Sequence, residues 1–168
     1  RKRKKIVIGI PGSIDPLKKD YLKILKLIGK LNELKKNIKV YFIGHFQSNT
    51  STYTKQKENY YFLKFKKELN KLKKDGFDIV LFKKKLSQKL YQKCVKECDI
   101  MYAHLNFRTY KPSEGNAWTS AYTEGITYNK IILTNRKNSP KDIDAIELKY
   151  TTDEEFYKII RFIINNKH

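Results

Sequence analysis

Residues 111–134 of this chain read KPSEGNAWTSAYTEGITYNKIILT, and this stretch decides the expected fold. A polar, glycine-containing loop opens a short predicted helix that carries Glu124, and the helix gives way to an apolar strand at 130–133. Another apolar strand, at 99–104, precedes the loop. This order of strand, glycine loop, helix and strand is typical of sites for phosphorylated ligands, because the loop and the helix N-terminus present unpaired N–H groups to an anion.

The same alternation of strand and helix extends over the whole chain. Apolar strands are expected at 5–10, 39–44, 77–82, 99–104, 130–133 and 145–148. Helices are expected from Asp15, from Phe62 to Gly76, from Ser87 to Glu97, around Glu124 and from Thr152. The alternation predicts the α/β class: a single Rossmann-like domain over residues 1–168, with a mostly parallel sheet of about six strands and helices on both faces.

Four loops are candidates for the functional site, because ligands bind beyond the carboxyl ends of parallel strands. They are residues 11–19, 44–59, 83–87 and 105–118. The second is rich in Ser, Thr, Asn and Gln from 45 to 59 and shows no apolar period, which predicts a long functional loop.

The formal net charge of +20 raises the question of an anionic partner. The lysines are spread along the sequence, and AT-rich coding favours lysine, so nucleic acid is not expected to be the main partner. Attraction to phosphates or anionic lipid headgroups is expected instead, with peripheral contact at an anionic membrane surface.

The sequence shows no signal peptide and no apolar run long enough to span a bilayer, which predicts a cytoplasmic location. A chain that starts at Arg1 is expected to be a piece of a longer protein.

The two cysteines, Cys94 and Cys98, are spaced to lie on one face of a predicted helix. A zinc site takes about four ligands and a redox pair has two intervening residues, and neither pattern is present. Buried free thiols are therefore expected, with no metal and no cofactor.

Three segments carry a resemblance to a known family. Residues 10–18 (IPGSIDPLK) look like an opening strand and glycine turn followed by a basic residue. Residues 86–100 (LSQKLYQKCVKECDI) look like the helix that precedes the strand bearing the donor loop, and residues 124–133 (EGITYNKIIL) look like the next helix-to-strand segment. In this order they resemble the C-terminal, donor-binding half of GT-B glycosyltransferases of the retaining, glycogen-synthase-like group 1 type. The resemblance implies a domain that binds a nucleotide-diphosphate sugar for transfer to an acceptor.

The chain departs from the family's pattern at several positions. Ser13 stands where arginine is common, Asn129 where glycine is common and Ile131 where proline is common. Glu114 and Glu124 are separated by nine residues rather than the family's seven. The phosphate contacts and the role of Glu114 are therefore left more open than the role of Glu124.

Several residues match the chemistry of a nucleotide sugar. The carboxylate of Glu124 can accept hydrogen bonds from both ribose hydroxyls. Backbone N–H groups at the expected helix start, and a lysine of the first loop, can stabilise the leaving diphosphate. The expected donor-binding residues are Gly12, Ser13, Lys18, Lys19, Gly115, Asn116, Ala117 and Glu124, and the catalytic candidates are Glu114 and His104.

Each candidate also has an ordinary structural interpretation. Glu124 fits a solvated helix position, and Glu114 fits a loop residue of no special role. Lys18 and Lys19 fit an exposed helix face. His104, at a strand end, fits a hydrogen-bonded structural histidine, which outweighs a general base.

Two functions from other classes remain open. Residues 40–44, 98–100 and 115–118 also resemble a nucleoside deoxyribosyltransferase-like enzyme, although Thr119 stands where that family has a nucleophilic glutamate. The other alternative is a basic, non-catalytic module that binds nucleic acid or another anion. GT-B enzymes react between two Rossmann domains, so a missing N-terminal acceptor domain or a partner chain is expected. The acceptor, whether glycan, lipid or protein, is not predicted.

Overall fold

The computed structural model describes residues 5–12, 14, 19–44, 52–82, 85–106, 119–135 and 144–166. It contains a six-stranded sheet in the order β3-β2-β1-β4-β5-β6, and every neighbouring pair is parallel. The predicted α/β fold with a Rossmann-like sheet is confirmed. The strands are β1 (Ile6–Pro11), β2 (Ile38–Ile43), β3 (Asp78–Leu81), β4 (Ile100–Ala103), β5 (Ile131–Thr134) and β6 (Glu147–Lys149).

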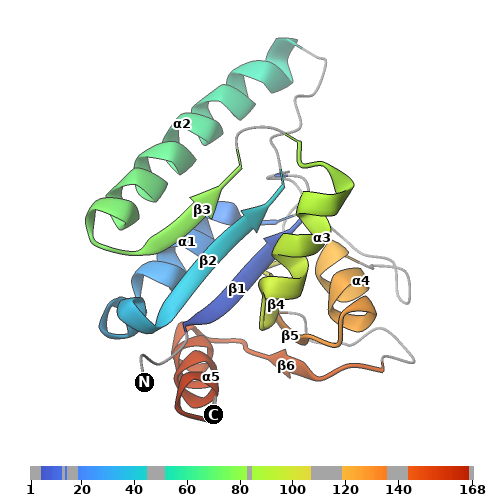
Figure 1. Ribbon diagram of the computed structural model, residues 1–168. Coiled ribbons are helices and arrows are strands. Elements are labelled where there is room, and N and C mark those ends of the chain that lie inside the picture. Colours follow the sequence, from blue (N-terminus) through green and yellow to red (C-terminus); the bar gives the residue numbers. More distant parts are fainter. Residues whose placement is uncertain are drawn as a thin grey trace.

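Helices cover both faces of the sheet (Figure 1). The helices are α1 (Tyr21–Gly29), α2 (Thr52–Lys74), α3 (Gln88–Glu97), α4 (Ser120–Thr127) and α5 (Asp153–Asn166), with a 3-10 helix, η1, at Asn32–Asn37. Alternate residues of a strand point to opposite faces. Ile8, Val40 and Tyr102 accordingly pack in a cluster with α1, α2 and α5, whereas Met101 and Ala103 pack with α3 and α4.

The predicted start of the first helix is wrong within the described residues. The sequence suggested a start at Asp15, but α1 begins at Tyr21, and the side chain of Asp20 caps it by accepting a hydrogen bond from the Lys23 N–H at 2.9 Å. Asp20 also donates its backbone N–H to the carbonyl of His104 at 3.1 Å, and Lys19 forms an isolated bridge with Leu105. These tertiary contacts hold Lys19 and Asp20 out of the helix.

The predicted loop at 44–59 is also partly wrong, because α2 begins at Thr52. The part of α2 that packs against the rest of the domain lies further along the helix. There the Tyr61 hydroxyl accepts a hydrogen bond from the Leu22 N–H at 3.1 Å, and Phe65 is fully buried. Helix formation is cooperative, so a packed half extends into preceding residues that carry no apolar period. Residues 45–51 lie outside the described part of the chain.

Local signals for the other helix ends are confirmed. Ser87 accepts the Leu90 N–H at 3.4 Å, and Thr152 with Glu155 forms the expected capping box, with hydrogen bonds of 3.1 and 3.2 Å. Gly76 ends α2 with φ +91°, and Asn129 adopts a left-handed conformation with φ +49° after α4. In the described part of the chain, none of the helices is both long and apolar enough to cross a membrane.

Candidate functional site

The topology has one point where the chain reverses direction across the sheet. From β1 it proceeds to β2 and β3 on one side, and α3 then carries it back to β4 on the other side of β1. Ligands of open α/β sheets bind outside the carboxyl ends of the two strands at such a point. We call the ends of β1 and β4, with the residues that directly follow them, the switch point.

Gly12, Lys19 and Ser120 lie against the end of β1 at the switch point. The Pro11 carbonyl accepts a hydrogen bond from the Lys19 Nζ at 2.5 Å and another from the Ser120 Oγ at 2.9 Å. Gly12 follows with φ +92°, and a Cβ built there would lie 2.3 Å from the Ser120 Oγ. Glycine is therefore required by both backbone conformation and space. The structure brings the predicted residues Gly12 and Lys19 together, and it adds Ser120, which the sequence did not indicate.

Lys19 is a cation held inside the protein. Its side chain is 5% exposed, and its Nζ lies 3.5 Å from the position of a Cβ on Gly12. Lysine is rarely buried to this extent unless its charge meets partners or a ligand. The buried ammonium places a positive charge directly at the end of β1.

The N-terminus of α4 faces the same place, because Ser120 is its first residue and contacts Pro11. Thr119 is the N-cap, but its side chain makes no capping hydrogen bond, and its Oγ1 is buried without a partner among the described residues. The first N–H groups of a helix lack acceptors within the helix. Together with Lys19, they make this end of the sheet suited to an anion.

Asn135 fixes the loop after β4 to the end of β5. Its side-chain amide pairs with both backbone groups of Leu105, with Oδ1 accepting the N–H at 2.7 Å and Nδ2 donating to the carbonyl at 3.0 Å. Leu105 also bridges to Lys19. The segments that follow β1, β4 and β5 are therefore tied together at the carboxyl edge.

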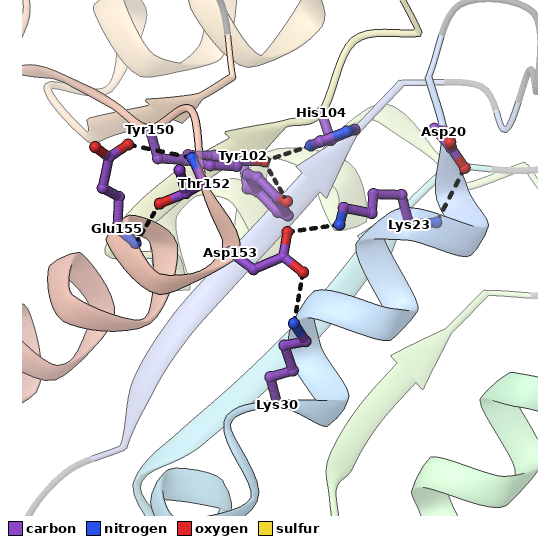
Figure 2. A network of polar contacts seen from close by, with 9 residues as sticks. All are labelled: Asp20, Lys23, Lys30, Tyr102, His104, Tyr150, Thr152, Asp153 and Glu155. Carbon is purple, nitrogen blue, oxygen red and sulfur yellow. Dashed lines mark hydrogen bonds and ion pairs between the residues drawn. The ribbon is translucent and has the colours of Figure 1, made fainter.

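His104, at the end of β4, belongs to a buried network with two tyrosines (Figure 2). Its Nδ1 is hydrogen-bonded to the Tyr150 hydroxyl at 2.5 Å, and that hydroxyl is 2.7 Å from the Tyr102 hydroxyl. Burial lowers the pKa of His104 to about 4, so the ring is neutral at pH 7. These contacts favour the structural interpretation, and a catalytic role for His104 stays a prediction.

An ion-pair cluster fastens α5 to α1 beside this network (Figure 2). Asp153 accepts hydrogen bonds from the Lys23 Nζ at 2.5 Å and from the Lys30 Nζ at 2.6 Å. These two bonds lower the pKa of Asp153 to about 2. Asp153 thus remains ionised through the range in which a histidine titrates.

We expect the stability of the chain to fall when the pH is lowered from about 7.5 to about 5. The ordinary pKa of histidine is 6.5 and that of folded His104 is about 4, so between these values the unfolded chain binds a proton that the folded chain does not. The free energy of unfolding should drop by about 2 kcal/mol. Urea unfolding at both pH values measures it. His104→Phe should remove most of the drop, and an unchanged pH dependence in that variant would contradict the assignment.

Glu124 lies half-buried on α4 and faces α3. Its Oε1 accepts a hydrogen bond from the Tyr91 hydroxyl at 2.9 Å, and burial followed by this bond raises the pKa of Tyr91. Tyr91 was not singled out from the sequence, because nothing local indicates that α3 and α4 meet. The proposed ribose contact of Glu124 stays a prediction.

The remaining predicted site residues lie outside the described part of the chain. They are Ser13, Lys18, Glu114, Gly115, Asn116 and Ala117.

The cysteines are free and buried, as predicted, and burial raises the pKa of Cys98 to about 12. No group of acidic, histidine or cysteine side chains in the described residues could hold a metal ion.

A surface hollow of about 570 Å³ lies at the opposite, amino edge of the sheet, and its lining includes Lys89, Lys93, Lys96 and Lys130. It contains none of the predicted site residues.

No protein-family model and no curated protein matches the sequence. Solved structures do match. A UDP-forming alpha,alpha-trehalose-phosphate synthase from Burkholderia xenovorans, in complex with glucose-6-phosphate, has a TM-score of 0.67 at 9% identity over 98% of this chain and 37% of its own. The C-terminal domain of the group 1 glycosyl transferase LpcC from Francisella tularensis matches with a TM-score of 0.63 and 14% sequence identity. The match covers 97% of this chain and 77% of that domain's chain.

The same fold occurs in proteins named for another reaction. A putative UDP-N-acetylglucosamine 2-epimerase from Listeria monocytogenes has a TM-score of 0.52 at 10% identity, over 98% of this chain and 38% of its own. This chain thus spans little more than a third of the length of the synthase and the epimerase. At these identities the likeness concerns the fold, and the resemblance read from the sequence is confirmed at that level: the chain has the Rossmann-like fold found in GT-B glycosyltransferases.

Proposed function

We propose that this chain binds the diphosphate of a nucleotide sugar at the switch point and acts as the donor-binding domain of a glycosyltransferase. The observation that carries the proposal is the buried Lys19, which lies at the end of β1 beside the N-terminus of α4. A diphosphate is the group of a nucleotide sugar that such positive charge attracts, and it gains negative charge as the sugar leaves.

The structural neighbours support a uridine nucleotide as the first ligand to test. The synthase and the epimerase are named for different reactions, yet UDP appears in both names. The domain likeness to the C-terminal part of LpcC supports transfer rather than epimerisation. As the chain spans about a third of the synthase, the acceptor site belongs, in this proposal, to another domain or a partner chain.

The proposal assigns His104 a hydrogen-bonding role. Because its ring is neutral at pH 7 and its Nδ1 is held by Tyr150, the imidazole is oriented and can offer only Nε2 to a ligand. Proton transfer by a group with a pKa of about 4 is inefficient near neutral pH. Glu114 is the remaining candidate for a catalytic carboxylate.

We expect calorimetric titration to show binding of UDP, and weaker binding of GDP or ADP. UMP should bind at least about tenfold more weakly than UDP, because it lacks the second phosphate. No heat and no thermal shift with any nucleotide at high concentration would contradict the proposed function.

Glu124→Gln should lower the affinity for UDP about tenfold. Tyr91 already donates a hydrogen bond to one carboxylate oxygen, and the other oxygen would lose one charge-assisted hydrogen bond to the ribose.

Glu97→Gln is a matched control for this titration. Glu97 ends α3, and its Oε2 accepts a tyrosine hydroxyl, that of Tyr41, at 2.8 Å. Glu97 shares with Glu124 the hydrogen bond from a tyrosine hydroxyl, but it is exposed and lies at the amino edge of the sheet. The control variant should therefore bind UDP like the parent, and a loss equal to that of Glu124→Gln would indicate an effect of charge rather than of the ribose contact.

A further inference from the structure

Folding gathers lysines on α2 that look dispersed in the sequence. Lys64, Lys67, Lys71 and Lys74 follow one another at intervals of three or four residues, so they lie on one side of the helix, and all are exposed. The opposite side packs into the core through Phe65, Leu69 and Leu72, which are 0%, 3% and 8% exposed. We call the four lysines the basic face of α2; it is about 15 Å long.

The basic face is not neutralised by the described part of the protein. Ion pairs there engage other lysines, namely Lys5, Lys23, Lys30, Lys149 and Lys158. None of the four lysines of the basic face is within ion-pair distance of a described carboxylate. Lys64 and Lys71 line a hollow beside α1 together with Glu68 and Asp75, whereas Lys67 and Lys74 lie outside that hollow. An uncompensated row of charges of one sign attracts an external surface of the opposite sign.

Two apolar side chains stand beside the N-terminal end of the basic face. Tyr60 is 71% exposed and Leu63 is 66% exposed, and their spacing from Lys64 and Lys67 places them on the same side of α2. An exposed leucine gains nothing from a nucleic-acid backbone, whereas it gains free energy when it enters the acyl region of a bilayer. A tyrosine at the same level suits the membrane interface, and lysines suit anionic headgroups.

We propose that α2 docks this chain, through its basic face with Tyr60 and Leu63, onto the surface of an anionic lipid bilayer. The helix packs beside α1 on one face of the sheet, over the β2 and β3 side, where Phe65 contacts Phe42 of β2 (Figure 1). The proposal does not depend on nucleotide binding.

The test is partition of the intact chain onto phosphatidylcholine vesicles with and without phosphatidylserine. Each lysine near an anionic surface strengthens binding about fivefold, so Lys67→Gln, Lys71→Gln and Lys74→Gln together should weaken it about a hundredfold. Binding should be negligible without phosphatidylserine, and it should fall as salt is raised above about 0.15 M. Leu63→Ser should weaken binding about tenfold with no change in salt dependence.

A matched triple variant separates a docking face from net charge. Lys89, Lys93 and Lys96 lie exposed on α3 at helical spacing, and changing them to glutamine removes the same three charges. This control should stay within about threefold of the parent. Equal losses of vesicle affinity in the α2 triple variant and the α3 triple variant would overturn the proposal, because binding would then depend on total charge alone.

Two further readouts complete the test. Circular dichroism and thermal unfolding should show that both triples fold, and UDP titration of the α2 triple should match the parent, so that failure of docking and failure of nucleotide binding are distinguished. Tighter binding of duplex DNA or single-stranded RNA through the same three lysines, with no binding to phosphatidylserine vesicles, would identify a nucleic-acid face and overturn the membrane proposal.

Discussion

Gly12→Ala should lower the free energy of unfolding by about 3 kcal/mol. Two costs add together. The backbone of Gly12 has φ +92°, which L side chains rarely adopt, and the new Cβ would lie 2.3 Å from the Ser120 Oγ. Urea unfolding at neutral pH measures the loss.

Gly76→Ala isolates the first of these costs. Gly76 has almost the same backbone conformation, with φ +91°, but the nearest atom to its Cβ position is 3.9 Å away. This variant should lose about 1 kcal/mol from strain alone. The difference between the two glycines then gives the cost of crowding at the switch point.

Removing the hydroxyl that would clash should recover part of the loss. In a Ser120→Ala background the closest remaining contact for a Cβ on Gly12 is the Ser120 Cβ at 3.3 Å. Gly12→Ala should then cost about 1–2 kcal/mol less than in the parent. If both glycines cost the same, or if Ser120→Ala gives no recovery, then β1 and α4 do not approach each other as closely as the structure shows.

Most of the fold could be predicted from the sequence because the deciding signals are local. Strands such as 6–10 and 100–103 are continuous apolar runs, and a strand covered on both faces by helices requires such a run. Ser87 and the pair Thr152 and Glu155 mark helix starts through hydrogen bonds within one turn. These signals depend on no distant part of the chain.

The two errors concern segments that tertiary contacts control. Asp15 followed by Pro16 is a good helix start by local criteria, but Asp20 becomes the N-cap of α1, since Lys19 and Asp20 are bound to the residues that follow β4. The first turns of α2 carry no apolar period, which is the signal that a sequence-based prediction needs. Their helical state follows from the packed half of the same helix.

The candidate site was predicted in its location and less well in its contacts. Parallel strands bring their carboxyl ends to one edge, so Gly12 and His104 could be placed at that edge from the alternation alone. Tyr150 and Ser120, which bind His104 and the end of β1, come from elements far along the chain. Their pairing depends on strand order and helix packing, which no local pattern encodes.

Lys19→Met should lower the affinity for UDP about ten- to a hundredfold, because a buried ammonium that meets a phosphate makes charge-assisted hydrogen bonds worth about 1.5–3 kcal/mol. Methionine keeps a flexible apolar stem of similar length in the 5% exposed position. The Pro11 carbonyl keeps its hydrogen bond from the Ser120 Oγ at 2.9 Å. Folding should therefore survive, and thermal unfolding without ligand checks this.

Lys18→Met is the control, because the sequence could not decide between the two lysines. If Lys19 is the phosphate ligand, Lys18→Met should bind UDP within about threefold of the parent. Titrations at low and high salt add a second readout, since the parent should lose affinity with salt more steeply than Lys19→Met. A large loss in Lys18→Met with none in Lys19→Met would transfer the phosphate contact to Lys18. Unchanged binding in both variants would mean that UDP, if it binds, does so away from the end of β1.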